Sequence, residues 1–245
     1  MLQALIDVFF RAYLWELIAS IAGAYYLING KDIPFINRLL VYFLWFTFLV
    51  DLIGFYPLVA YYSDYKILSF VKGTRYAQNY WLYNPLMLLG YIAYISFFLV
   101  HLKKARTKKI LKMVTVIFVL ITIINFIFSG LFFIGYSAFV TFVGSLILLV
   151  TIGTYFYQVL HSDEILEFYK GLPFYVGVGA LLWHLCITPL FLYNKYGIMN
   201  ANPEFVQLYM KFLTGMNVVL YVLIASGFII EVRKNARLRK ASELL

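Results

Sequence analysis

The stretch that decides the fold is His101-Leu-Lys-Lys-Ala-Arg-Thr-Lys-Lys-Ile-Leu-Lys112, which places six Lys and Arg residues between two long apolar runs. A segment with this much charge cannot lie in hydrocarbon, so we expect it to form a loop in water. Lys and Arg accumulate in the loops on the cytoplasmic side of a membrane. We therefore place this loop inside the cell, which orients the chain on both sides of it.

The composition is typical of a polytopic membrane protein. Of the 245 residues, 64% are hydrophobic and 13% are charged, whereas about a quarter of the residues in soluble domains are charged. We therefore expect one transmembrane domain over residues 1–245. The net charge of +9 comes from basic residues at the ends of the apolar runs, where they would face anionic lipid. We accordingly expect the lipid bilayer, and no nucleic acid, as a partner.

The apolar runs predict an all-α protein with seven transmembrane helices. Each run is long enough to cross a hydrocarbon core of about 30 Å, and none alternates with the period of two that a barrel strand requires. The expected spans are residues 5–28, 37–58, 80–101, 110–128, 134–160, 174–193 and 205–231.

Charge counting predicts that the N-terminus lies outside and the C-terminus inside. With the 101–112 loop inside, 14 of the 20 Lys and Arg residues lie in the inner segments. The inner segments are 29–38, 101–112, 161–171 and the tail after Glu231. This bias places the protein in the cytoplasmic (inner) membrane as a multi-pass protein.

A faint internal similarity suggests a 3+1+3 arrangement of parallel repeats. The motif around Gly23 in the first span resembles the motif around Gly153 in the fifth, and Asn84 in the third span corresponds to Asn217 in the seventh. Helices one to three would then repeat as helices five to seven, with helix four as the joint. Parallel repeats occur in transporters, which bind substrate at the repeat interface.

Two acids lie deep in apolar helices, and ionisable groups there are functional hypotheses by default. Glu16 lies in the first expected span and Asp51 in the outer half of the second. At similar depth on adjacent helices, they could share a proton or bind a cation or an amine. The alternative is that each holds a buried hydrogen-bond network that fixes helix packing.

Other polar residues extend this candidate ligand site. His184 lies in the middle of the sixth span, and Asn84 and Asn217 are two-way hydrogen-bonding groups in apolar helices. We expect these three to line a site with Glu16 and Asp51. The alternative for each is a role in helix packing without contact to a ligand. For Asp7, Arg11 and Asn125 we expect structural roles, since the first two can pair at i,i+4 near the outer interface.

The residues that carry a resemblance extend over nearly the whole chain. They are Glu16, Asp51-Leu-Ile-Gly54, Trp81-Leu-Tyr-Asn84, Asn125, Ser162-Asp-Glu-Ile165, Pro173-Phe174 and Gly179. In these the chain resembles a family of uncharacterised bacterial seven-helix membrane proteins, which implies a shared fold and no stated activity. The 3+1+3 helices and the asparagines also resemble the PQ-loop sugar transporters, but the Pro-Gln motif of that family is missing here.

We expect a non-enzymatic transporter or facilitator that binds a small molecule or ion in the outer half of the bundle. The alternative is a sensory or scaffold subunit, as a homo-oligomer or with a cytoplasmic signalling partner. Its docking face would include Lys103, Lys104, Arg106, Asp163 and Glu164. An intramembrane enzyme ranks third, because the three histidines form no metal motif and no nucleophile–base pattern appears. We expect no metal and no cofactor.

Overall fold

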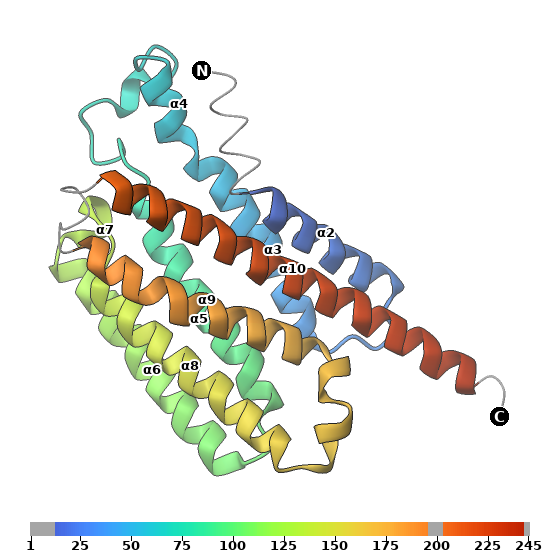
Figure 1. Ribbon diagram of the computed structural model, residues 1–245. Helices are drawn as coiled ribbons and strands as arrows, with labels where there is room; N and C mark the ends of the chain where they lie inside the picture. The colour runs from blue at the N-terminus through green and yellow to red at the C-terminus, as the bar shows by residue number, and fades with distance from the viewer. Residues whose placement is uncertain (1–12, 196–202, 243–245) are drawn as a thin grey trace.

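The computed structural model describes residues 13–195 and 203–242, and within these residues it is built of helices without strands (Figure 1). Continuous apolar runs favour this outcome, because a helix satisfies every backbone group within its own segment in lipid. The long helices are α2 (Leu14–Asn29), α3 (Phe35–Gly54), α5 (Tyr80–His101), α6 (Ala105–Phe128), α8 (Ala138–Leu160), α9 (Leu172–Lys195) and α10 (Pro203–Ser242). The short ones are α4 (Tyr56–Tyr62), η1 (Ser69–Val71), α7 (Leu131–Ile134), η2 (Asp163–Leu166) and η3 (Phe168–Lys170).

Six of the described segments are long and apolar enough to cross a membrane. They are Phe35–Tyr62, Tyr80–His101, Ala105–Phe128, Ala138–Leu160, Leu172–Tyr193 and Glu204–Arg237. They correspond to the second to seventh expected spans. The first expected span, 5–28, begins outside the described residues, and α2 covers its second part. The chain is therefore an all-helical, membrane-embedded protein.

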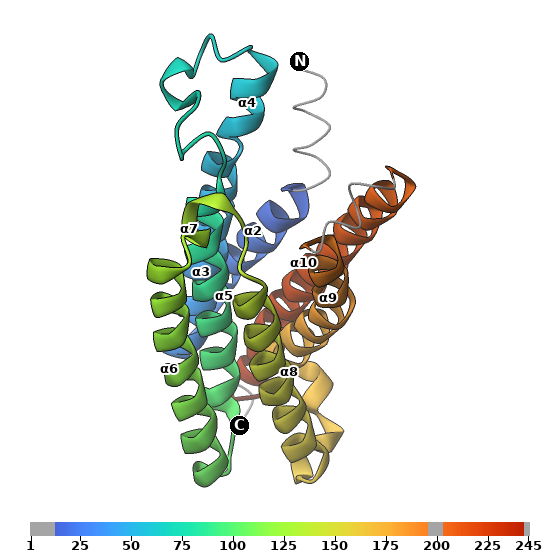
Figure 2. The ribbon, with the colours of Figure 1, turned by 90° about the vertical axis from the view of Figure 1, so that its left-hand side faces the viewer.

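Six helices form a closed ring. In cyclic order, neighbouring contacts join α2 to α3, α3 to α5, α5 to α8, α8 to α9, α9 to α10, and α10 back to α2. Helix α6 lies outside this ring and packs on α5 and α8 (Figure 2). Its outer face carries exposed Ile117, Leu120, Ile124 and Ile127, an apolar surface that suits contact with lipid.

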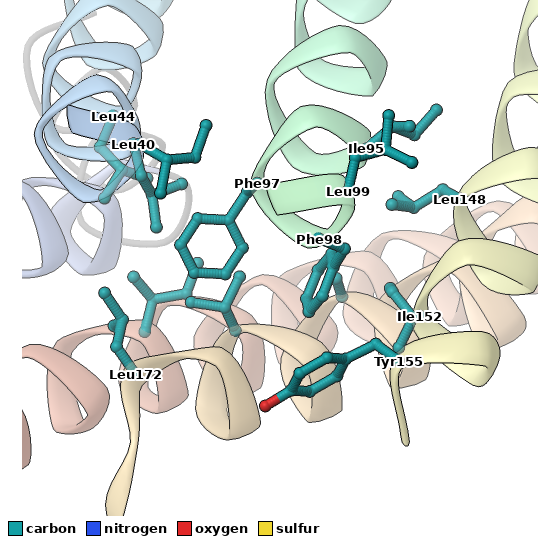
Figure 3. Packing of buried hydrophobic residues seen from close by; sticks show 14 of the residues in the cluster. Leu40, Leu44, Ile95, Phe97, Phe98, Leu99, Leu148, Ile152, Tyr155 and Leu172 are labelled. Carbon is teal, nitrogen blue, oxygen red and sulfur yellow. The ribbon is translucent and has the colours of Figure 1, made fainter. Parts of the chain in front are cut away.

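The middle of the ring is filled by close-packed aromatic and aliphatic side chains. Phe97 and Phe98 of α5 are fully buried and meet edge to face. They lie among Leu40 of α3, Leu148 of α8 and Leu172 of α9 (Figure 3). This cluster fills the half of the ring toward the C-terminal ends of α5 and α8, so space for a ligand in the middle of the ring lies in the other half.

The connections between helices group at two ends of the bundle. Residues 30–34, 102–104 and 161–171 lie toward the end where α10 terminates, and 63–79 and 129–137 lie toward the opposite end (Figure 1). Between α6 and α7 the chain turns at Gly130, whose φ of +66° falls in the left-handed region that favours glycine. Ser137 then caps α8 by accepting a hydrogen bond from the Val140 amide.

Candidate functional site

A cavity of about 410 Å³ lies inside the ring, toward the end formed by connections 63–79 and 129–137. Its walls come mainly from α3, α5, α9 and α10. Small-molecule sites in proteins commonly have volumes of this order. The cavity is the natural place to look for the polar residues that the sequence singles out.

Three of the five predicted ligand residues line this cavity together. Asp51 comes from the last turn of α3, His184 from the middle of α9, and Asn217 from α10. These residues are far apart in the sequence, and it is the ring closure that brings their helices together. Their role in ligand binding stays a prediction.

Glu16 contacts Asp51 but does not itself line the cavity. It is 1% exposed on α2, and its side chain interacts with Asp51 and with the hydroxyl of Tyr221. Asp51 also interacts with the hydroxyl of Tyr83. Among the described residues, no hydrogen-bond partner reaches Glu16 Oε1. The two acids therefore meet at one wall of the cavity, and only Asp51 faces the space.

Asn217 is held in place by a neighbouring tryptophan. Trp183 Nε1 donates a 2.7 Å hydrogen bond to Asn217 Oδ1, and both residues line the cavity. The carbonyl oxygen has two lone pairs and Trp183 uses one of them, so Asn217 Oδ1 can still accept a hydrogen bond from a ligand, and its amide nitrogen can donate one.

His184 is anchored through a buried serine. Ser145 Oγ lies 2.9 Å from His184 Nδ1, 2.9 Å from the Tyr91 hydroxyl and 2.8 Å from the Thr188 hydroxyl. Tyr91 also donates to the Thr141 carbonyl at 3.0 Å. Ser145 is 1% exposed and is not among the cavity-lining residues. A serine beside a histidine could suggest a nucleophile, but this hydroxyl has three structural partners and no face on the cavity.

Asn84 is turned away from the cavity. Its Nδ2 donates to the carbonyls of Leu131, Phe132 and Gly135, at 3.4, 3.1 and 3.1 Å. The side chain is completely buried and ties α5 to α7. The geometry therefore gives Asn84 a structural role, which differs from our expectation that it would face a ligand beside Asn217.

Of the three residues expected to be structural, Asn125 lies in the described part of the chain. Asn125 Oδ1 accepts a 3.1 Å hydrogen bond from Ser137 Oγ, which joins the end of α6 to the start of α8. Asp7 and Arg11 lie outside the described residues.

The predicted docking face lies at the other end of the bundle. Lys103, Lys104, Arg106 and Asp163 are exposed there, and the side chain of Glu164 lies outside the described part of the chain. The Lys103 amide donates a 2.8 Å hydrogen bond to Gln158 Oε1, which joins this loop to the end of α8.

Sequence reasoning missed the aromatic hydroxyls of the cavity. Six tyrosines line it: Tyr83, Tyr91, Tyr94, Tyr136, Tyr209 and Tyr221. The signal was compositional, because 22 Tyr is a high number for so apolar a chain. Selecting these six from the others would have required the rotation of each helix.

The lining favours a positively charged ligand. Among the described residues, no Lys or Arg lines the cavity, whereas Asp51 does. Aromatic faces attract cations through their negative ring surfaces, and the tyrosine hydroxyls and Asn217 offer further hydrogen bonds. A carboxyl group inside an aromatic cavity is a chemical match for an amine.

Comparison with known proteins adds no relative: no family model matches the chain, and no curated protein or solved structure is significantly similar to it.

Proposed function

We propose that this protein is a transporter or facilitator that binds a small organic amine in the cavity of the helix ring. The observation that carries the proposal is the meeting of Asp51, His184 and Asn217 on one cavity that Glu16 supports from behind and that no described cation lines. The ammonium group would contact Asp51, and an apolar or aromatic body would occupy the tyrosine-rich remainder.

The acid pair gives the site a way to couple binding to a proton. Two adjacent carboxyl groups in a desolvated place cannot both stay ionised at low cost, so they share a proton. An arriving ammonium group compensates the second negative charge and allows that proton to leave. Uptake of the amine would then be coupled to release of a proton.

We further propose the full topology of seven spans, with the N-terminus outside, in the cytoplasmic membrane. The end of the bundle that holds the 102–104 loop is the basic end, and the amine cavity lies toward the opposite end. With the basic end inside, the cavity opens in the outer half. The cyclic order of the ring supports a 3+1+3 repeat, because α2, α3, α5 and α8, α9, α10 form its two halves and α6 stands outside.

The test is a binding experiment with purified protein and a matched pair of probes. Phenethylamine and phenethyl alcohol have nearly the same size and differ in charge. We expect the amine alone to raise the thermal unfolding midpoint. In Asp51→Asn the amine affinity should fall at least about tenfold, since truncating one partner of a buried charge pair costs about 2 kcal/mol or more.

The control is Asp163→Asn, which removes an exposed carboxylate at the other end of the bundle and should bind like the unmodified protein. Equal effects of the amine and the alcohol, or full amine affinity in Asp51→Asn, would contradict the proposal. The sensory or scaffold alternative would then be preferred. Counterflow of the labelled amine in proteoliposomes distinguishes a transporter from a protein that only binds.

A further inference from the structure

A second cavity, of about 360 Å³, lies at the opposite end of the bundle from the amine cavity. Its lining residues are Glu167, Lys170, Ile230, Arg233, Lys234 and Arg237. They come from two places, the η3 turn with the residue just before it and the C-terminal part of α10. Four of the six side chains are cationic and one is acidic.

The cations of α10 share one helix face. Ile230, Arg233, Lys234 and Arg237 are spaced at i, i+3, i+4 and i+7, which is the pattern of a single helical stripe. The stripe faces η3, where Lys170 adds a fourth positive charge. The arrangement is thus a two-sided pocket rather than a flat basic surface.

The single acid of the pocket is already neutralised. Lys170 Nζ donates a 2.8 Å hydrogen bond to Glu167 Oε1. This hydrogen bond lowers the pKa of Glu167 and raises the pKa of Lys170, so both stay charged near neutral pH. Among the described residues, no ion pair involves Arg233, Lys234 or Arg237. These three cations are therefore available to an anion.

A hydrogen bond between α9 and α10 fixes the position of the helix that carries the cations of this pocket. Glu231 Oε2 accepts a 3.1 Å hydrogen bond from the Leu172 amide, at the first residue of α9. One turn earlier, a Cβ on Gly227 would lie 2.9 Å from the Cβ of Tyr175, so α9 and α10 approach closely there. The basic stripe is consequently held beside η3.

The pocket lies at the depth where a membrane surface would be. Arg233 is three residues beyond the apolar Ile230, or about 4.5 Å along the helix. On the neighbouring turns, Leu166 and Tyr169 are 78% and 47% exposed. An exposed leucine and tyrosine beside a cluster of cations are typical of the interfacial layer, where tyrosine rings sit at the level of the headgroups.

We propose that this pocket binds the phosphate group of an anionic membrane lipid. Phosphate oxygens accept hydrogen bonds from guanidinium and ammonium groups in strong, charge-assisted contacts. The acyl chains of the lipid would continue along the apolar surface that begins at Ile230. A free phosphate ion would use the same cations but would gain nothing from that apolar surface.

The experiment measures binding of dioctanoyl phosphatidylglycerol to the purified full-length protein in a neutral detergent. Dioctanoyl phosphatidylcholine and inorganic phosphate serve as the comparison probes. We expect saturable binding of phosphatidylglycerol, and at least tenfold weaker binding in the double variant Arg233→Gln/Arg237→Gln. Glutamine is a good helix former, so α10 should persist, which circular dichroism checks.

The matched control is Arg106→Gln/Lys109→Gln, which removes the same charge from exposed positions near the same end of the bundle. It should keep the affinity for phosphatidylglycerol. An equal loss in both double variants would overturn the proposal in favour of diffuse attraction. Inorganic phosphate binding as tightly as the lipid would also overturn it, because the site would then be a free-anion site.

Discussion

Asn84 and Asn217 are both side-chain amides inside membrane spans, but their surroundings assign them opposite tasks. Asn84 holds three backbone carbonyls near α7, and Asn217 lines the cavity beside Trp183. One amide should therefore matter for stability and the other for binding.

We expect Asn84→Ala to lower the free energy of unfolding by about 1 kcal/mol, as for a lost hydrogen-bonding group within a membrane bundle. Its affinity for phenethylamine should stay unchanged. Asn217→Ala should instead weaken phenethylamine binding by about tenfold, or about 1.4 kcal/mol. Thermal unfolding and ligand titration of both variants measure the two effects. Asn29→Ala is the control, because that exposed amide donates to the Tyr25 carbonyl of its own helix and does not line the cavity.

At the residue scale, the sequence identified which side chains are costly in lipid but not which way they point. Asp51, His184 and Asn217 line one cavity, which agrees with the tendency of polar groups in apolar helices to face the interior of the bundle. That they bind a ligand stays a prediction. Asn84 finds hydrogen-bond partners at α7 with its amide nitrogen only, since no hydrogen-bond partner in the described part of the chain reaches its Oδ1. The choice between these outcomes depends on helix rotation, which packing decides and the spacing of apolar residues does not.

At the scale of elements, the expected spans agree with the described helices except near their ends. Residues 134–160 were expected as one span, but α8 begins at Ala138, and the short α7 precedes it. The physical reason is that Gly130, with its left-handed φ, separates α7 from α6, and that Ser137 caps the start of α8. The close approach of α5 and α8 at Gly144 could not be foreseen, because it requires that this glycine face the ring of Tyr91.

That contact gives a matched pair of variants on α8. A Cβ on Gly144 would lie 2.5 Å from the ring of Tyr91, whereas a Cβ on Gly153 would meet nothing within 4 Å. Gly144→Ala should destabilise the protein by about 2 kcal/mol through overpacking. Gly153→Ala should be neutral or stabilising by up to about 1 kcal/mol, since alanine favours helix. Equal unfolding midpoints for the two variants would refute this account of the α5–α8 interface.

At the scale of the whole molecule, hydropathy predicted membrane-crossing helices but not the closed ring. The ring depends on the contact of α10 with α2, two elements from opposite ends of the chain. The repeat stays a prediction at this scale. Its two paired glycines have different environments, because Gly23 packs against Val41 and Phe228 while Gly153 is open.

Orientation in the membrane can be tested with single cysteines in a Cys186→Ala background. Ser69→Cys places a thiol in an exposed part of the 63–79 connection, and Asp163→Cys places one in the 161–171 connection. In intact cells, a membrane-impermeant maleimide should label the Ser69→Cys protein, and should label the Asp163→Cys protein only after permeabilisation. The reverse pattern would invert the topology, and labelling of both in intact cells would show that the two connections lie on one side.

The length of α10 connects the two proposed sites mechanically. Its 40 residues form one continuous helix that carries Asn217 in the amine cavity and Arg233 in the lipid pocket, about 24 Å apart along its axis. Because the helix is continuous over this distance, a change of its tilt at one site would also move its residues at the other site. Coupling between two sites is reciprocal. An amine that tilts α10 would change the protein's preference for anionic lipid, and the lipid content of one leaflet would set the amine affinity at the other.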